Sequence, residues 1–168
     1  MDSVLKVLAA VGVVLAASAL AQPATIEGVV VGVESGDTMT VSTPQGQIEV
    51  RLADIGAPQG PQFYAPAARA LLSAIVQDRP VAVTVTGRKG DSAVFGRVRR
   101  GELDVNLELV QRGAAWVCWD YAGDTAYLPY ENHAQRARIG IWPRTLEVQV
   151  YVSCHDRPPA ARPLYPRN

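Results

Sequence analysis

The stretch that decides the fold is residues 26–53, which read IEGVVVGVESGDTMTVSTPQGQIEVRLA. It holds three runs of β-branched and apolar residues, separated by Ser-Gly and Pro-Gln-Gly breaks that are typical of turns. In the third run Ile48, Val50 and Leu52 alternate with polar residues, as in a strand with one buried face. The pattern predicts three consecutive strands, over residues 26–34, 38–43 and 47–53.

Further along, the chain changes between helical and strand patterns. Pro66 can open a helix that runs to about Val76, and Asp104 can cap a helix over 105–112 that Gly113 ends. The other predicted elements are a strand pair over 81–86 and 93–99, an extended segment over 114–119, and a helix over 129–139 stopped by Gly140. This order predicts an α+β fold, a five-stranded Greek-key barrel of the OB type with about three flanking helices.

The N-terminus has the pattern of a secretory signal peptide. Lys6 precedes an apolar run of 15 residues, from Val7 to Ala21, which ends in an A-x-A sequence. A membrane-spanning helix needs about 20 residues, so an uncleaved anchor is the weaker alternative. We therefore expect a signal peptide over 1–21, export to the periplasm or the medium without stable membrane insertion, a domain over 22–142 and a Pro-rich tail over 143–168.

Charge and cysteine content add two open questions. The 16 basic and 16 acidic residues balance, and a net charge of zero does not favour a protein that binds duplex DNA non-specifically. Five basic residues nevertheless lie between positions 88 and 100. They form either a solvated face or an anion-binding face. Cys118 and Cys154 form either a disulfide, as an exported protein favours, or two free buried thiols. The disulfide would close a loop of 36 residues (154 minus 118), worth about 3–4 kcal/mol by chain entropy.

Five short motifs, taken together, resemble the staphylococcal nuclease (thermonuclease) family between about residues 26 and 142. They are SGDT at 35–38, RLADIGAP at 51–58, FGR at 95–97, DVNLELVQRGAAWV at 104–117 and ENHAQRARIGIW at 131–142. Each is weak alone, but the order and spacing make the set specific. The resemblance implies hydrolysis of DNA or RNA phosphodiesters with calcium. We expect a single-stranded nucleic acid as partner and a monomeric protein.

The resemblance also implies roles for individual residues. Asp37 matches a metal-binding aspartate, and Arg51 and Arg97 match two arginines that clamp the phosphate. Guanidinium is a planar, permanently charged donor suited to phosphate, and calcium takes about six to eight oxygen ligands. The ordinary alternatives are a turn aspartate and two surface arginines.

The loop after Arg51 departs from the family pattern R-L-x-G-I-D-A-P-E. Gly56 stands where the family has a second metal-binding aspartate, and Gln59 stands where it has the glutamate proposed to activate water. A neutral amide orients a water but cannot accept its proton at pH 7, and loss of a general base alone slows a reaction by about 10²- to 10⁴-fold. Ser35 replaces a further aspartate.

Asp54 is the one acid left in this loop. If the backbone is extended, residues 54 and 56 share a face about 6–7 Å apart, and Asp54 would then lean toward the metal position as a replacement ligand. We favour the alternative, an aspartate that is solvated or paired with a nearby arginine.

Three aromatic residues are candidates for contact with nucleic acid. Trp119 and Tyr121 match positions where the family places aromatics beside the base, a contact worth about 1–3 kcal/mol per base. Phe95 replaces a tyrosine and lacks its hydroxyl. We assign Trp116 and Trp142 to packing.

Three functions stay open. The favoured one is an exported protein that binds nucleic acid or other phosphodiester ligands, with calcium-dependent hydrolysis weakened or lost. The second is an active secreted, calcium-dependent nuclease that uses Asp37, Asp54 and a relocated base. We expect weak calcium binding and no other cofactor. The third is a non-enzymatic OB-fold interaction module.

Overall fold

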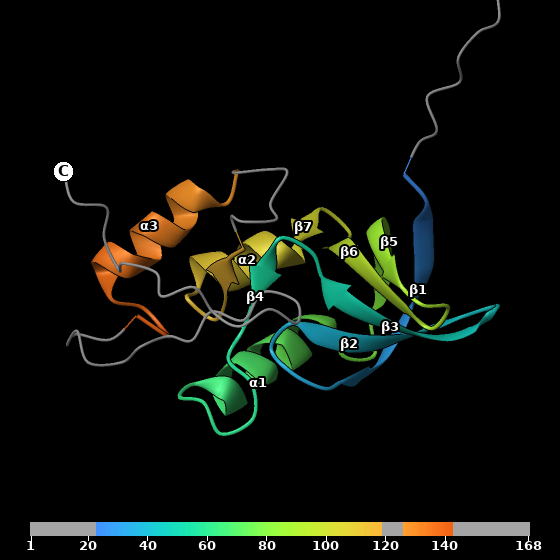
Figure 1. The fold of residues 1–168 in the computed structure, drawn as a ribbon, viewed down its shortest axis with the longest axis horizontal. Helices are drawn as coiled ribbons and strands as arrows, with labels where there is room; N and C mark the ends of the chain where they lie inside the picture. Colours follow the sequence, from blue (N-terminus) through green and yellow to red (C-terminus); the bar gives the residue numbers. More distant parts are fainter. Residues whose placement is uncertain (1–22, 119–125, 143–168) are drawn as a thin grey trace, which may run out of the picture.

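A closed barrel forms the centre of the protein. The computed structural model describes residues 23–118 and 126–142 (Figure 1). The barrel strands are β1 (Thr25–Val33), β2 (Thr38–Thr43), β3 (Gly46–Leu52), β5 (Pro80–Lys89) and β6 (Ala93–Arg100). Antiparallel pairs join β1 to β2 and β5, β2 to β3, and β5 to β6, and the parallel pair β3–β6 closes the ring. The predicted five-stranded OB-type barrel is confirmed.

Helices cover one end of this barrel. Figure 1 shows α2 between the barrel and α3, with α1 below them. The helices are α1 (Ala65–Val76), α2 (Val105–Gln111) and α3 (Leu128–Ala137). The short strands of the described chain are β4 (Ile55–Gly56), β7 (Leu103–Asp104) and β8 (Trp116–Val117), and β4 pairs antiparallel with β8. All three helices were predicted within a few residues, whereas β4 and β7 were not predicted.

Residues alternate between the inside and the outside of the barrel along β3 and β6. Val50, Leu52 and Val94 are at most 1% exposed and fill the interior. Arg51 and Phe95 lie next to them in the sequence and therefore face outward. Along these two strands the inward-facing residues are thus apolar, and the polar and aromatic side chains of Arg51 and Phe95 lie on the outer face.

Two fully buried polar side chains fasten the helices to the rest of the fold. Asn106 of α2 accepts a hydrogen bond from the Val98 N–H at 3.0 Å and donates to the Ala53 carbonyl at 2.9 Å. Glu131 of α3 accepts from the Val117 N–H at 3.0 Å. Both are 0% exposed, so their hydrogen bonds replace those that the backbone groups would make with water.

The structure confirms the predicted start of α2 and corrects the predicted end of α3. The Asp104 carboxylate accepts from the Leu107 N–H at 3.0 Å, so the predicted cap is confirmed. The predicted end of the last helix at residue 139 was wrong, because Arg138 already adopts a left-handed conformation (φ 56°) and α3 ends at Ala137. Gly140 (φ 64°) turns the chain afterwards.

A second cluster packs beside the barrel. Trp116, Cys118, Ala134, Ile141 and Trp142 are each at most 5% exposed and contact one another. The packing role predicted for the two tryptophans is therefore confirmed. Among the residues described, no helix is long and apolar enough to cross a membrane.

Candidate functional site

Arg51 and Arg97 share the outer face of the two strands that close the barrel. In the parallel register of β3 and β6, Arg51 lies opposite Phe95, and Arg97 follows two residues later on the same face. Both arginines are partly exposed. We call the outward side of Arg51, Phe95 and Arg97 the arginine face. Barrel closure therefore brings together the two arginines that the sequence predicted to bind phosphate.

Asp37 lies beside this face, immediately before β2, and only 7% of it is exposed. Its Oδ1 accepts hydrogen bonds from the hydroxyls of Ser35 at 2.7 Å and Thr38 at 3.0 Å. Its Oδ2 accepts from the Ala57 N–H at 3.1 Å, and its backbone carbonyl accepts from the Leu52 N–H at 2.8 Å. The SGDT motif thus forms a turn that holds the carboxylate against the loop after β4.

The side chain of Gln59 reaches the same carboxylate. Its Nε2 lies 3.2 Å from Oδ1 and 3.4 Å from Oδ2 of Asp37, and its backbone N–H donates to Oε1 of Gln62 at 2.7 Å. A carboxylate only accepts hydrogen bonds, so it is the NH₂ group of Gln59 that faces Asp37. The predicted metal-binding and base positions are therefore adjacent, with a donor in the place of the base.

The oxygen atoms around Asp37 do not fit the calcium site that the family implies. Calcium takes about six to eight oxygen ligands, commonly several of them carboxylates. Gly56 supplies no side chain, and the described residues contain no group of three or more His, Cys, Asp or Glu that could hold a metal. Both oxygens of Asp37 already accept hydrogen bonds. A cation at this position would have to displace the Gln59 amide, and it would gain only one carboxylate ligand, that of Asp37.

Asp54 points to Arg97 instead of the metal position. Its Oδ2 lies 2.8 Å from Nε of Arg97, and the carboxylate side chain is 11% exposed. The extended backbone considered for Asp54 was wrong, because this residue forms the turn between β3 and β4 with φ 65°. Residues 54 and 56 therefore do not follow strand alternation, and the arginine-paired alternative is confirmed.

Tyr127, which sequence reasoning missed, is a buried tyrosine that senses the charges of Arg97 and Asp54. Its hydroxyl donates to Oδ2 of Asp104 at 3.1 Å. Burial, followed by the negative charge of Asp104, raises the pKa of Tyr127 above its ordinary value, while the charges of Arg97 and Asp54 act on it in opposite directions. No motif surrounds Tyr127 that could have marked it in the sequence.

Trp119, Tyr121 and Cys154 lie outside the described residues. Just before this gap, the N–H of Cys118 donates to the Asp54 carbonyl at 2.8 Å. No described cysteine is free, and the pairing of Cys118 with Cys154 stays a prediction.

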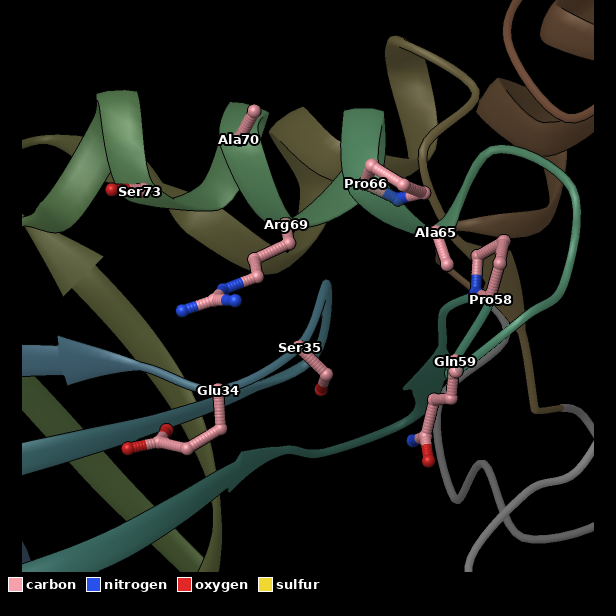
Figure 2. Close-up of a pocket in the computed structure, with 10 residues that line it drawn as sticks. Glu34, Ser35, Pro58, Gln59, Ala65, Pro66, Arg69, Ala70 and Ser73 are labelled. Carbon is pink, nitrogen blue, oxygen red and sulfur yellow. The ribbon is translucent and has the colours of Figure 1, made fainter.

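A cavity of about 560 Å³ adjoins Gln59, between α1 and the turn that joins β1 to β2 (Figure 2). Arg69 of α1 extends over it, held by a hydrogen bond from its Nε to the Val33 carbonyl at 2.8 Å. Glu34 lines the opposite wall. One base and one acid give the cavity no strong preference for either sign of charge, and no sequence motif predicted it.

The fold and the site together define a small OB-type barrel that carries Arg51 and Arg97 on one outer face, with the acids Asp37 and Asp54 close by. A family model described as staphylococcal nuclease homologue matches residues 49–144, more than half of the chain. The chain belongs to the staphylococcal nuclease family, a family of nucleases that act on nucleic acids.

Three curated relatives agree with this assignment. A Haemophilus influenzae protein named as an uncharacterized endonuclease is 33% identical over 114 residues, which span 67% of this chain and 64% of the relative. An Escherichia coli protein of the same name is 32% identical over 120 residues, 71% of this chain and 78% of the relative. A micrococcal nuclease of Shigella flexneri is 34% identical over 131 residues, 71% of this chain and 75% of the relative. The chain thus spans less than two thirds of the first of these relatives.

Proposed function

We propose that this protein binds single-stranded nucleic acid, or a related phosphodiester ligand, on the arginine face, and that calcium-dependent hydrolysis there is weakened or lost. The observation that carries the proposal is the shared outer face of Arg51 and Arg97 on β3 and β6. Two guanidinium groups side by side suit the oxygens of a phosphodiester. Phe95 lies opposite Arg51 in register and two residues before Arg97 on the same face, where it offers an aromatic surface for a base.

Weakened hydrolysis follows from the surroundings of Asp37. The Gln59 amide donates to this carboxylate and cannot take a proton from an attacking water. Gly56 brings no carboxylate to a metal. The residues proposed for binding, Arg51 and Arg97, are retained, whereas Gly56 and Gln59 replace the second metal-binding carboxylate and the general base that hydrolysis needs in addition.

The remaining parts of the proposal concern the mature protein. The signal-peptide pattern supports removal of residues 1–21 and export to the periplasm or the medium. An oxidising compartment favours the disulfide between Cys118 and Cys154. We expect a monomer, because a single strand needs only one such face.

Binding is tested by fluorescence anisotropy with a short labelled oligothymidylate over a range of salt concentrations. Arg51→Ala is expected to weaken binding. It is also expected to make the dependence of the logarithm of the binding constant on the logarithm of the salt concentration less steep by about 0.7, the value for one lost contact to single-stranded phosphate. Arg79→Ala is the matched control, since this exposed arginine lies before β5 and off the arginine face. Equal effects of both substitutions would contradict a specific site.

A second candidate, an active endonuclease, is favoured by the names of the relatives. The same oligonucleotide is incubated with calcium, magnesium or manganese, and the products are separated on a gel. We expect no more cleavage by the wild-type protein than by Arg51→Ala. Cleavage that disappears with Arg51→Ala would establish the second candidate instead.

A further inference from the structure

We infer that the Asp54 carboxylate is an internal counter-ion of Arg97. It competes with phosphate for this guanidinium and so determines which anions bind to the arginine face. The inference rests on the proposed function, because it concerns the affinity of the same face. Asp54 would make this face a weak and selective phosphate site. A ligand gains the full charge of Arg97 only by displacing the Asp54 carboxylate.

The backbone holds Asp54 in a conformation that an aspartate adopts only at a cost. Its φ of 65° lies in the left-handed region, which glycine adopts freely and which aspartate adopts less readily than glycine but more readily than most other residues. The turn is fixed on both sides: the Ala53 N–H donates to the Gly96 carbonyl and the Cys118 N–H donates to the Asp54 carbonyl, each at 2.8 Å. The fixed turn therefore holds the Asp54 side chain in place beside Arg97.

Asp54 and Arg97 form a close ion pair. The 2.8 Å distance from Nε to Oδ2 is that of a charge-assisted hydrogen bond. The carboxylate is 11% exposed and the guanidinium 37% exposed, so an incoming ligand meets the arginine while the aspartate stays behind it. A carboxylate at Nε also occupies one of the donors that a phosphate would use for bidentate binding.

The charges around the site lead to the same conclusion. Arg51 and Arg97 carry two positive charges, and Asp37 and Asp54 carry two negative charges, so the four side chains sum to zero. The two aspartates therefore reduce, but do not cancel, the attraction that a phosphate meets at the exposed guanidinium groups. The reduction grows with the charge of the ligand, so a dianionic phosphomonoester end loses more attraction than a phosphodiester with one charge per phosphate.

The experiment measures binding of inorganic phosphate by calorimetry and of the labelled oligothymidylate by anisotropy. Asp54→Asn removes the charge and keeps the size, and Asp54→Gly removes the side chain at a φ that glycine adopts freely. Both are expected to tighten phosphate binding by about threefold to tenfold, Asp54→Gly at least as much as Asp54→Asn. Unchanged or weaker binding in both variants would overturn the inference and indicate that Asp54 only orients Arg97.

Two controls distinguish competition at Arg97 from the general electrostatic effect of removing a negative charge. Glu49→Gln removes an exposed acid of β3, and it is expected to tighten binding clearly less than Asp54→Asn. In an Arg97→Ala background, Asp54→Asn is expected to give no gain; a persisting gain would contradict the inference.

The outcomes also distinguish this inference from the proposed function. If the wild-type protein binds the oligonucleotide through Arg51 but the Asp54 variants bind no better, only the inference fails. If the Asp54 variants gain phosphate affinity while the wild-type protein binds no oligonucleotide, only the proposed function fails.

Discussion

The side-chain amide of Gln59 donates hydrogen bonds to both carboxylate oxygens of Asp37, over 3.2 and 3.4 Å. The amide stands where the family resemblance places a glutamate, and it satisfies Asp37 without any metal. Two carboxylates this close would repel each other unless a cation lay between them. An amide and a carboxylate attract each other, so this arrangement is stable by itself.

Restoring the two missing acids is expected to create calcium binding. The double variant Gly56→Asp with Gln59→Glu gives Asp37 two carboxylate neighbours, which suits a hard cation. We expect the double variant to bind calcium at least about tenfold more tightly than the wild-type protein does, as measured by calorimetry. Adding Asp37→Asn should abolish the gain. Equal affinity of the wild-type protein and the double variant would show that the Gln59 amide is no obstacle to calcium.

Loss of the Asn106 side chain is expected to destabilise the whole domain. Asn106→Ala leaves the buried Val98 N–H and Ala53 carbonyl without their partner, at about 1–3 kcal/mol for each group. We expect the free energy of unfolding in urea to fall by about 2–4 kcal/mol. Asn132→Ala, at an exposed position of α3, is the control and should change it by less than about 0.5 kcal/mol. Similar losses in both variants would contradict the anchoring role of Asn106.

Two glycines allow the cost of a clash to be separated from the cost of a left-handed backbone. Gly101 (φ 57°) has open space around the position of a Cβ, whereas a Cβ at Gly140 (φ 64°) would overlap the Gly113 carbonyl oxygen. Gly101→Ala is expected to cost about 1–2 kcal/mol, and Gly140→Ala at least about 2 kcal/mol more. Thermal unfolding measures both, and equal midpoints would disprove the clash.

Tyr127 is expected to make the protein less stable at high pH. Burial and the charge of Asp104 raise the pKa of Tyr127 in the folded protein above the ordinary value of 10.0. Above about pH 10 the unfolded chain releases this proton while the folded protein keeps it, so stability falls as pH rises, by up to about 1.4 kcal/mol per pH unit.

Urea unfolding at several pH values measures this effect as the difference between the wild-type protein and Tyr127→Phe. Below pH 10 the difference should be constant and reflect the lost hydrogen bond to Asp104. Above it, only the wild-type protein should show the additional decline. Parallel curves throughout would contradict the raised pKa.

The predicted disulfide is testable by mass spectrometry. In denaturant, neither Cys118 nor Cys154 should react with an alkylating reagent until a reductant is added. Cys154→Ser is then expected to lower the free energy of unfolding by about 3–4 kcal/mol. Alkylation of both cysteines without a reductant would exclude the bond.

The barrel was predictable because its signals are local and periodic. The alternation of Ile48, Val50 and Leu52 specifies a strand with one buried face wherever that strand pairs. The Asp104 cap depends on residues three apart and was predicted for the same reason. The parallel β3–β6 closure could be inferred only through the order of elements and the family motifs.

The details of the site were less predictable because they lie in turns. The metal-binding alternative for Asp54 depended on strand alternation, but a turn residue with φ 65° follows no period. The contact between Gln59 and Asp37 joins residues 22 positions apart, and it depends on the path of a two-residue strand, β4, that carries no sequence pattern of its own. Arg51 and Arg97 were placed correctly because they lie on regular strands.

The alternation along β3 and β6 also has an evolutionary consequence. Val50 and Val94 close the barrel from inside, and Arg51 and Phe95, one residue further along each strand, face the solvent. Selection for folding and selection for chemistry therefore act on different, interleaved positions. Substitutions on the outer face can therefore change the reactive groups one at a time without removing side chains from the core.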